Sequence, residues 1–467
     1  MLYFRESEEE IIRAFVSSET KKAMAVYGRR RTGKTELILN YIHETGGAGI
    51  VYFQAASFDY DVCLADFKNT LKPYFPDDSL FDAARSFKDL FTYLKVAESS
   101  VRLIIIDEFP FIAKKNENVP VEFQWIIDHG LGGIKLVFLG SNQSFMRSQI
   151  SDSESPLYGR FDEILEVLPF SFKEVNILFP NFEDAVRIYA ETGGVAQYVM
   201  FYKEYSSITE AEDRLFFNRY GRLFQESHNI LSQEFRDVTT YESILRAIGC
   251  GEKDSSQIAV KCGTDARGIF AYLTKLESIG AVSAVVNPLS SKKKEKKYRI
   301  SDNLLRFHFT FIEPNISIIA ELGTEARDYV LGSRFSEYLG FVYEDIVRSS
   351  CYRFAAAGKL PFMPFTVGKW WGGISINGAW SESEVDLIAY NDSEIIVGEC
   401  KYRNKAAGIG EFEHLKMKAE FIPVSGRQIH YLIASRSGFT PELEDLYSEY
   451  HNALILIDKT DIIGVSA

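Results

Sequence analysis

Five short apolar runs between residues 23 and 170 restrict the fold of this chain more than any other feature. They read AMAVYG, IVYFQA, RLIIID, IKLVFLGS and EILEVLPF, and helix-like stretches separate them. Near-continuous apolar runs with helices between them are typical of parallel strands that are buried on both faces of a sheet. The pattern therefore predicts an α/β fold with a central parallel sheet.

The size and charge of the chain limit its class. Its 467 residues exceed what one hydrophobic core accommodates, and 46% hydrophobic with 25% charged residues is typical of a globular protein. The sequence shows neither a basic-then-apolar N-terminal signal nor an apolar run of roughly eighteen residues, so we expect a cytoplasmic protein without a membrane span. The net charge of −13 disfavours a surface coated in nucleic acid, although a local basic patch can still bind a phosphate backbone.

The first apolar run leads directly into GRRRTGKTE. This segment matches the pattern G-x-x-x-x-G-K-[ST] between a strand and a helix, where glycines and backbone amides wrap around phosphate groups. Lys34 would reach the outer phosphates of a nucleotide, and the Thr35 hydroxyl would hold Mg²⁺. The predicted nucleotide-binding residues here are Gly28, Arg29, Arg30, Arg31, Thr32, Gly33, Lys34, Thr35 and Glu36.

The third apolar run ends in Asp107 and Glu108, within LIIIDEFP. A carboxylate at the end of an apolar strand is costly unless it faces a ligand or a metal ion. In the division of labour of P-loop proteins, Asp107 would hold Mg²⁺ through water, and Glu108 would orient and deprotonate the attacking water. Asn142, after the next strand, is either a γ-phosphate sensor or a turn-forming residue.

Five segments of the first half of the chain carry a family resemblance. In the order FRESEEEIIRAF, GRRRTGKTE, LIIIDEF, SPLYGRFDEILEVLPF and TGGVAQYV, they resemble the archaeal-type P-loop ATPases, a group close to the AAA+ and signal-transducing NTPases. The resemblance implies ATP hydrolysis, nucleotide contact by Phe4 and Arg5, and a γ-phosphate-sensing or finger role for Arg160. A surface ion pair is the alternative for Arg160. The family usually has proline where this chain has Ala196, which leaves the lid contact open.

The middle of the chain has a different pattern. YESILRAIGCG, SSQIAVKCG and TDARGIFAYLTKLESIGAV read as three helices, and two strand-like runs flank SSKKKEKKYR. Three helices and a hairpin predict a winged helix-turn-helix, with Thr264 and Asp265 as helix-cap candidates.

Residues 292–299 hold six Lys or Arg and one Glu, which indicates either a solvated loop or a wing that contacts DNA phosphates. The candidate phosphate contacts are Lys292, Lys293, Lys294, Lys296 and Lys297. The third helix adds only Arg267 and Lys275 as exposed basic residues. Contact with double-stranded DNA therefore stays open beside an intramolecular or protein-binding role.

Near the C-terminus, EVDLIAY and IIVGECKY read as a hairpin around NDSE. This pairing sets Asp386 directly across from Glu399, and alternation puts Lys401 on the same face as Glu399. Two adjacent carboxylates repel each other unless a cation lies between them, so the pair predicts a Mg²⁺ or Mn²⁺ site. Lys401 would then act on water or phosphate. A structural ion pair at a sheet edge is the alternative.

The order Asp, then Glu-x-Lys, resembles the restriction-endonuclease-like nuclease fold. GFVYEDIVR and GKWWGG extend the resemblance, which implies that Glu344 is a helix-borne metal ligand beside Asp386 and Glu399. These segments together look like the C-terminal domain of unassigned function that is fused to archaeal-type ATPases.

The resulting domain prediction has five parts. They are a P-loop ATPase core (1–170), a helical lid (171–227), a winged helix-turn-helix (228–310), a linker (311–334) and a restriction-endonuclease-like domain (335–467). Two functions stay open. The first is an ATPase that couples its nucleotide state to DNA binding and metal-dependent cleavage. The second is an ATP-gated switch, either a regulator or an oligomerising sensor with slow or single turnover, whose nuclease-like domain binds without cleaving.

Overall fold

The computed structural model describes residues 3–75, 78–249, 251, 253–290, 296–376, 379–450 and 453–464. The chain forms two compact units, Met1–Phe170 with Val195–Tyr198, and Ser171–Gly194 with Val199–Ala467. The finer boundaries within these units stay predictions. None of the helices in the described ranges combines the length and apolar composition that a membrane span needs.

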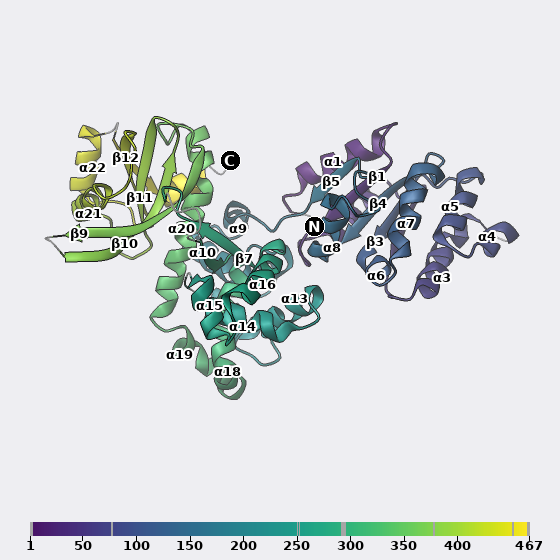
Figure 1. The fold of residues 1–467 in the computed structure, drawn as a ribbon, viewed down its shortest axis with the longest axis horizontal. Helices are drawn as coiled ribbons and strands as arrows, with labels where there is room; N and C mark the ends of the chain where they lie inside the picture. The colour runs from purple at the N-terminus through teal and green to yellow at the C-terminus, as the bar shows by residue number, and fades with distance from the viewer. Residues whose placement is uncertain are drawn as a thin grey trace. The chain divides into compact units, whose positions relative to one another are not determined.

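The first unit is built around a five-stranded sheet with the order β2-β3-β4-β1-β5 (Figure 1). Neighbouring strands pair in parallel throughout, and each strand corresponds to one of the five apolar runs, so the predicted parallel α/β core is confirmed. The strands are β1 (Ala23–Tyr27), β2 (Ile50–Gln54), β3 (Leu103–Asp107), β4 (Lys135–Gly140) and β5 (Glu163–Glu166).

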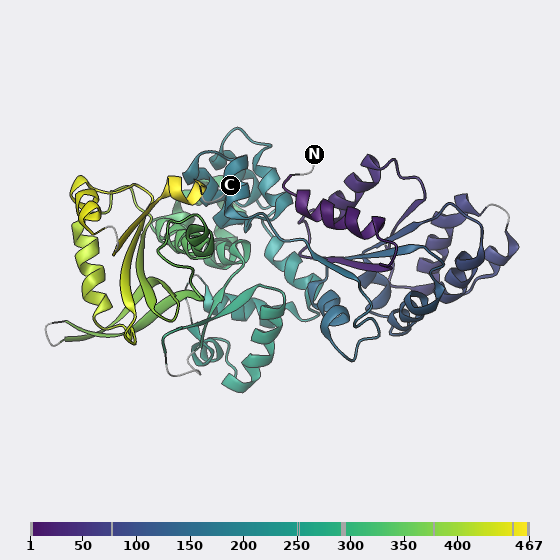
Figure 2. The same ribbon diagram turned by 90° about the horizontal axis from the view of Figure 1, so that it is seen from above.

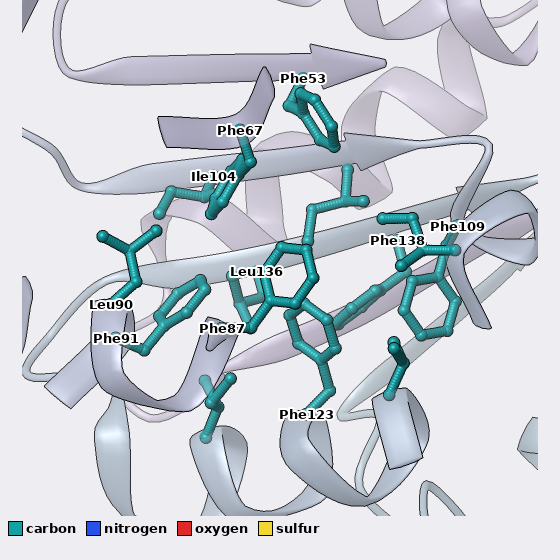
Figure 3. Packing of buried hydrophobic residues seen from close by; sticks show 14 of the residues in the cluster. Phe53, Phe67, Phe87, Leu90, Phe91, Ile104, Phe109, Phe123, Leu136 and Phe138 are labelled. Carbon is teal, nitrogen blue, oxygen red and sulfur yellow. The ribbon is translucent and has the colours of Figure 1, made fainter. Parts of the chain in front are cut away.

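Both faces of this sheet are buried by helices, which explains why the strands read as unbroken apolar runs. Along β3, Leu103 and Ile105 pack with α1 (Glu6–Ser17) and α2 (Lys34–Glu44). Ile104 and Ile106 pack on the opposite face, in an aromatic-rich core that includes Phe67, Phe91 and Phe123 (Figure 3). The helices on that side are α3 (Tyr60–Leu71), α5 (Phe87–Val96), α6 (Phe109–Ala113) and α7 (Asn118–Trp125). The unit also contains η1 (Lys72–Tyr74), α4 (Ser79–Ala83), η2 (Ile126–Gly130) and α8 (Gln143–Ser151).

A helical segment follows the first sheet in the chain, and most of it belongs to the second unit. Its helices are α9 (Phe172–Leu178), α10 (Phe182–Thr192), α11 (Ala196–Tyr202), whose first residues belong to the first unit, α12 (Ile208–Leu215) and α13 (Glu226–Glu234). The next elements are α14 (Val238–Ile248), β6 (Lys253–Asp254), α15 (Ser255–Lys261), α16 (Ala266–Ser278), β7 (Val282–Val286) and β8 (Lys296–Ile300). The three helices and two strands predicted for this segment are present, and a short strand, β6, adds to the sheet in the order β6-β8-β7. Asp265 caps α16 by accepting from the amides of Arg267 and Gly268.

Short helices follow, which begin near the end of the predicted winged-helix segment (228–310) and continue through the predicted linker (311–334). They are α17 (Asn303–Phe307), η3 (His308–Ile312), η4 (Glu313–Asn315), α18 (Ile316–Leu322), η5 (Gly323–Ala326) and α19 (Arg327–Leu331).

The C-terminal sheet has the order β13-β12-β11-β10-β9. Strands β9 to β11 are antiparallel, and β12 and β13 join in parallel. The sheet lies between α20 on one face and α21 with α22 on the other (Figure 2). Leu387 pairs with Gly398 and Tyr390 with Ile395, which is the predicted register of the hairpin. The elements are α20 (Arg334–Ala356), β9 (Thr366–Ile376), β10 (Ala379–Tyr390), β11 (Glu394–Lys401), α21 (Ile409–Ala419), β12 (Gln428–Ser435), α22 (Pro441–Glu449), β13 (Leu454–Asp458) and α23 (Lys459–Gly464).

Candidate functional site

The glycine-rich loop joins β1 to α2 and turns tightly at its glycines. Gly28 has φ 151° and lies so close to the residue after β5 that a Cβ there would stand 2.4 Å from the Val167 carbonyl oxygen. Gly33 has φ 98° and caps the N-terminus of α2. The hydroxyl of Thr32 donates to the Arg29 carbonyl at 2.8 Å, which closes the loop on itself. The loop therefore presents the N-terminus of a helix, where backbone amides favour an anion.

Lys34 is almost fully buried within this loop. Its Nζ donates to the carbonyl oxygens of Gly28, at 3.0 Å, and Arg29, at 2.8 Å. Burial lowers the pKa of Lys34 to about 8, although Glu108 and Asp107 act to raise it. The ammonium thus lies at the loop with only neutral carbonyl partners, and an anion would stabilise its charged form.

The arginines of the loop contact residues 195–198, which belong to the same compact unit as the loop. The guanidinium of Arg31 lies 5.3 Å, and that of Arg29 6.0 Å, from the centre of the Tyr198 ring. The Gln197 amide donates to the Arg31 carbonyl at 3.1 Å. Arg30 and Glu36, by contrast, are exposed. The TGGVAQYV segment therefore reaches the loop despite the departure at Ala196.

Asp107 closes β3 beside the loop and accepts three hydrogen bonds. Its Oδ2 accepts from the Thr35 hydroxyl at 2.8 Å and from the Tyr52 hydroxyl at 2.7 Å, and its Oδ1 accepts from the Glu108 amide at 2.8 Å. Burial raises the pKa of Tyr52, and the contact with Asp107 raises it further, so this hydroxyl keeps its proton. Sequence reasoning missed Tyr52, which lies on the neighbouring strand β2.

Glu108 has a left-handed backbone with φ 54°, a conformation that costs a non-glycine residue about 1–3 kcal/mol. Its carboxylate accepts from the Ser141 hydroxyl and, at 3.4 Å, from the Ser141 amide. The side chain of Asn142 instead caps α8, where it accepts from the Phe145 amide at 2.9 Å. Ser141 therefore contacts the Glu108 carboxylate, and the sensor role of Asn142 stays a prediction.

The N-terminal segment packs against the loop from within the protein. Arg5 is buried, and it donates to the carbonyls of Thr32 at 2.9 Å and Leu168 at 2.8 Å. The ring of Phe4 stacks edge-on against Phe170, with centres 5.6 Å apart. Arg5 thus ties the phosphate loop to the chain after β5, and direct contact of Phe4 and Arg5 with nucleotide stays a prediction.

Arg160 takes part in an ion pair in this structure. Its Nε and Nη2 donate to the carboxylate of Asp128 at 3.1–3.2 Å. This geometry matches the surface ion pair that the sequence left open. A finger role would require Arg160 to leave Asp128.

The C-terminal unit contains the second set of predicted site residues. Glu344 on α20 lies beside Asp386 on β10, and burial together with the neighbouring Asp386 charge raises the pKa of Glu344 to about 8. Burial and the Glu399 charge raise the pKa of Asp386 to about 6. Arg348 contacts both positions, since its Nη1 lies 3.3 Å from Glu344 Oε2 and 2.5 Å from the Asp386 carbonyl. Sequence reasoning missed this arginine.

Glu399 is paired with two lysines. Its Oε1 accepts from Lys401 Nζ at 2.7 Å, and its Oε2 accepts from Lys418 Nζ, on α21, at 3.3 Å. The Asp386 carboxylate accepts from the Cys400 amide at 2.8 Å. Within the described ranges, no three His, Cys, Asp or Glu side chains lie in position to hold one metal ion. The residues as arranged do not form a ready metal site.

Two family comparisons bear on the first unit and on part of the second. Residues 2–201 match a family described as an ATPase domain predominantly from Archaea, and residues 308–412 match one described as archaeal and bacterial proteins of unknown function. Among solved structures, a Walker-type ATPase of Pyrococcus abyssi has a TM-score of 0.50 at 18% identity, covering 66% of this chain and 96% of that one. The ORC2 protein of Aeropyrum pernix, solved with ADPNP and ADP, has a TM-score of 0.42 at 14% identity, covering 70% and 95%.

A parallel sheet with a glycine-rich loop at the start of α2 and an Asp-Glu pair at the end of β3 defines a P-loop ATPase, and the match over residues 2–201 agrees. The chain is thus a nucleotide-binding, NTP-hydrolysing enzyme. An uncharacterized protein of Methanocaldococcus jannaschii is 31% identical over 400 residues, which cover 84% of this chain and 85% of the relative. The chain belongs to the same family as this protein, with an archaeal-type ATPase domain in its first half.

Proposed function

We propose that this ATPase couples its nucleotide state to the binding of double-stranded DNA. The observation that carries the ATPase part is the 2.8 Å contact between the Thr35 hydroxyl and the Asp107 carboxylate at the end of the loop. These oxygen atoms fit Mg²⁺, which prefers oxygen ligands and, when bound, offsets the charge of the phosphates. We assign Thr35 and Asp107 to Mg²⁺, Glu108 to the attacking water, and the loop residues 28–36 to the phosphates of ATP.

The loop must rearrange slightly for this role. Lys34 has to exchange the carbonyls of Gly28 and Arg29 for phosphate oxygens, which restores full charge to an ammonium whose pKa burial lowers to about 8. Glu108 accepts a proton from water as the water oxygen attacks the γ-phosphorus and ADP leaves. Arg160, once free of Asp128, would stabilise the charge that develops on the γ-phosphate, as a sensor or a finger arginine.

Two substitutions test these assignments. Lys34→Ala is expected to abolish nucleotide binding, because the cation that meets the outer phosphates is lost. Glu108→Gln is expected to bind ATP but to release phosphate about 10²- to 10⁴-fold more slowly, because water loses its base. Fluorescent-nucleotide binding and phosphate release measure the two effects. Hydrolysis by the Gln variant at the parent rate would show that Glu108 is not the base.

The DNA-binding part is supported by the elements of residues 228–310. Three helices, α14 to α16, precede the antiparallel hairpin β7–β8, which is the element order of a winged helix. Arg267 and Lys275 are exposed on α16, and β8 carries Lys296, Lys297 and Arg299. Lys292, Lys293 and Lys294 precede β8 but fall outside the described residues. A basic strand beside a helix with exposed cations fits contacts to the phosphate backbone.

Salt-dependent binding of a fluorescent duplex tests this proposal. Replacing Arg267, Lys275 and Lys296 by Gln is expected to lower the slope of log K against log salt by about 0.9 for each lost phosphate contact. Comparison with ATP, ADP and no nucleotide tests the coupling, since equal affinity in all three would exclude it. A matched triple replacement of Lys88, Lys95 and Lys115, in the ATPase unit, is expected to leave the slope unchanged.

A second candidate function is metal-dependent DNA cleavage, with a restriction-endonuclease-like fold for residues 335–467. The observation in its favour is the pairing of Leu387 with Gly398, which are the chain neighbours of Asp386 and Glu399, together with the bond between Lys401 and Glu399. Each carboxylate already has protein partners, however, so we derive no catalytic step through a metal ion. This arrangement favours the alternative in which the domain binds without cleaving.

Calorimetry and a nicking assay separate these alternatives. If Asp386 and Glu399 share Mg²⁺ or Mn²⁺, the Lys34→Ala protein should still bind the ion, and Asp386→Asn should remove that binding. Lys401→Ala should retain the ion but lose cleavage of plasmid. Metal binding without nicking would support the switch, and the absence of metal binding would reduce the cluster to a structural ion-pair network.

A further inference from the structure

A cationic pocket of about 180 Å³ lies within the second unit. A cavity of about 10–15 Å³ by the same measure holds one water, so this pocket accommodates a group of several atoms. It lies between β8, α17, α20 and the β9–β10 hairpin. Five of its lining side chains are cationic, namely Lys297, Arg299, Arg306, Arg348 and Lys369. None of them has a role in ATP hydrolysis.

The three arginines are oriented by one partly buried carboxylate. Asp345 accepts from Arg348 at 2.6 Å, from Arg306 at 3.1 Å and from Arg299. These residues come from β8, α17 and α20, so the contact joins three elements. Asp345 thereby fixes the positions of the three guanidinium groups at the pocket wall.

The two lysines approach a different and more exposed carboxylate. Lys369 Nζ lies 3.3 Å from Glu384 Oε2, and Lys297 Nζ lies 3.9 Å from Glu384 Oε1. The Glu384 side chain is 54% exposed, whereas that of Lys369 is 12% exposed. Lys297 also lies over the Trp371 ring at 4.8 Å. A negatively charged ligand in the pocket could therefore meet both lysines in place of Glu384.

Among the described residues, these five cations face Glu344, Asp345 and Glu384, and Arg348 also interacts with the Asp386 carboxylate, so five cations meet four carboxylates. Like charges held close together where water is scarce repel one another, so an excess of cations favours an added anion. Planar guanidinium groups and ammonium groups together suit the oxygens of a phosphate.

We propose that this pocket binds a phosphate group of a DNA strand next to Glu344. The inference rests on the proposed DNA binding, because β8 both lines the pocket and carries the basic residues of the hairpin β7–β8. A strand whose backbone follows this hairpin places a phosphate within reach of Lys297 and Lys369. The pocket thereby positions the strand at the carboxylates of the C-terminal sheet. A free phosphate is the other source of the same chemistry.

The first arm of the test uses inorganic phosphate with the Lys34→Ala protein, in which the ATP site is disabled. Phosphate is expected to raise the melting temperature in a saturable manner, relative to chloride at equal ionic strength. The double variant Lys297→Gln/Lys369→Gln should lose this response. Glu384→Gln should strengthen it, because the carboxylate that competes for both lysines is removed. Lys416→Gln, which removes an exposed lysine on α21 outside the pocket, should leave it unchanged.

The second arm measures binding of a fluorescent duplex over a salt series. The double variant is expected to bind about 10- to 100-fold more weakly, with a slope reduced by about 0.9 for each lost phosphate contact. Lys297→Arg/Lys369→Arg should retain most of the affinity, which guards against a folding defect.

The two arms give separable outcomes. Loss of both responses in the double variant supports a DNA phosphate in the pocket. Loss of the phosphate response with unchanged DNA binding assigns the pocket to a free phosphate and overturns the DNA source. If the double variant responds like the parent and like Lys416→Gln in both arms, the pocket does not bind phosphate and the proposal is refuted. Failure of the parent to bind DNA refutes the proposed function, while the phosphate arm still decides whether the pocket binds anions.

Discussion

Asp107 and Glu108 are adjacent in sequence, yet their carboxylates accept hydrogen bonds from residues of different elements. Asp107 accepts from Tyr52 on β2 and from Thr35 on α2, whereas Glu108 accepts from Ser141 at the end of β4. The strand order β2-β3-β4 places one donor on each side of β3. Each carboxylate is thus oriented by a hydroxyl from a neighbouring strand.

Tyr52→Phe tests the first of these contacts. Without the Tyr52 hydroxyl, Asp107 Oδ2 would have no donor left among these contacts once Thr35 turns to a metal ion, and only the Glu108 amide on Oδ1 would remain. Loss of such an outer hydrogen bond typically costs about 10- to 100-fold in metal affinity or activity, so the Mg²⁺ concentration for half-maximal ATP hydrolysis should rise. Tyr60→Phe is the control, since its hydroxyl bonds Glu122 instead. Equal Mg²⁺ dependence in both variants would contradict the role of Tyr52.

Ser141→Ala tests the second contact. A hydrogen bond to a charged group contributes about 1.5–3 kcal/mol, so loss of this donor should lower kcat about tenfold or more if it orients Glu108. Nucleotide affinity should stay at the parent value, because Ser141 does not belong to the phosphate loop. Ser141→Thr, which keeps the hydroxyl, should restore kcat. A parallel fall in kcat and nucleotide affinity would indicate a general structural defect.

At the scale of elements, α20 connects the segments of the second unit. Asp345, on this helix, contacts Arg299 of β8, Arg306 of α17 and Arg348 of α20 itself. Burial acts to raise the pKa of Asp345, but the three arginines outweigh burial and hold that pKa well below its usual range. The helix is thereby bound to the hairpin β7–β8 by charge as well as by packing.

Asp345→Asn should therefore destabilise the second unit strongly. Breaking a buried ion pair by removing one partner costs about 3–5 kcal/mol, because the remaining charges stay buried without compensation. Urea unfolding followed by tryptophan fluorescence measures the change, since Trp370 and Trp371 lie in β9 of this unit. Asp328→Asn, at a carboxylate that is 87% exposed, should have little effect. Equal effects of the two substitutions would contradict a structural role of the cluster.

At the scale of the whole molecule, each unit has its own core and its own ionisable groups. His308 lies inside the second unit, where its Nε2 is 2.6 Å from the Leu223 carbonyl and its Nδ1 3.3 Å from the Ser227 hydroxyl. Burial lowers the pKa of His308 to about 4, although the Leu223 carbonyl acts to raise it. The folded unit therefore holds a neutral imidazole at neutral pH.

Because His308 is buried as a neutral imidazole, we expect the second unit to lose stability as the pH falls. The unfolded chain takes up a proton as the pH falls through about 6.5, whereas folded His308 does so only near pH 4. The contribution of neutral His308 to the free energy of unfolding is therefore fully present above pH 6.5. It declines towards pH 4, by at most about 1.4 kcal/mol per pH unit. His308→Gln should flatten the pH dependence of the unfolding midpoint between these values. An unchanged pH dependence in the His308→Gln protein would contradict this role of His308.

The pattern of residue types along the sequence was sufficient to predict the central sheet, the glycine-rich loop and the C-terminal hairpin. Apolar runs buried on both faces predict parallel strands, the glycine spacing predicts the loop, and alternation with a short turn predicts the pairing of Leu387 with Gly398. Local pattern was ambiguous where one residue type serves two purposes. Asn142 can sense phosphate or cap a helix, and only its position at the start of α8 shows the cap.

The sequence alone was enough to predict the five strands of the central sheet and the glycine-rich loop between β1 and α2, because these depend on the pattern of side chains along one segment. Only the tertiary structure shows which residues from distant segments contact each other. Tyr52 is 55 residues from Asp107, and Arg348 is 38 residues from the Asp386 carbonyl that it contacts. Such pairs form only after the strand order is set and α20 packs on its sheet. Strand order follows from the packing of whole elements, which no local period encodes.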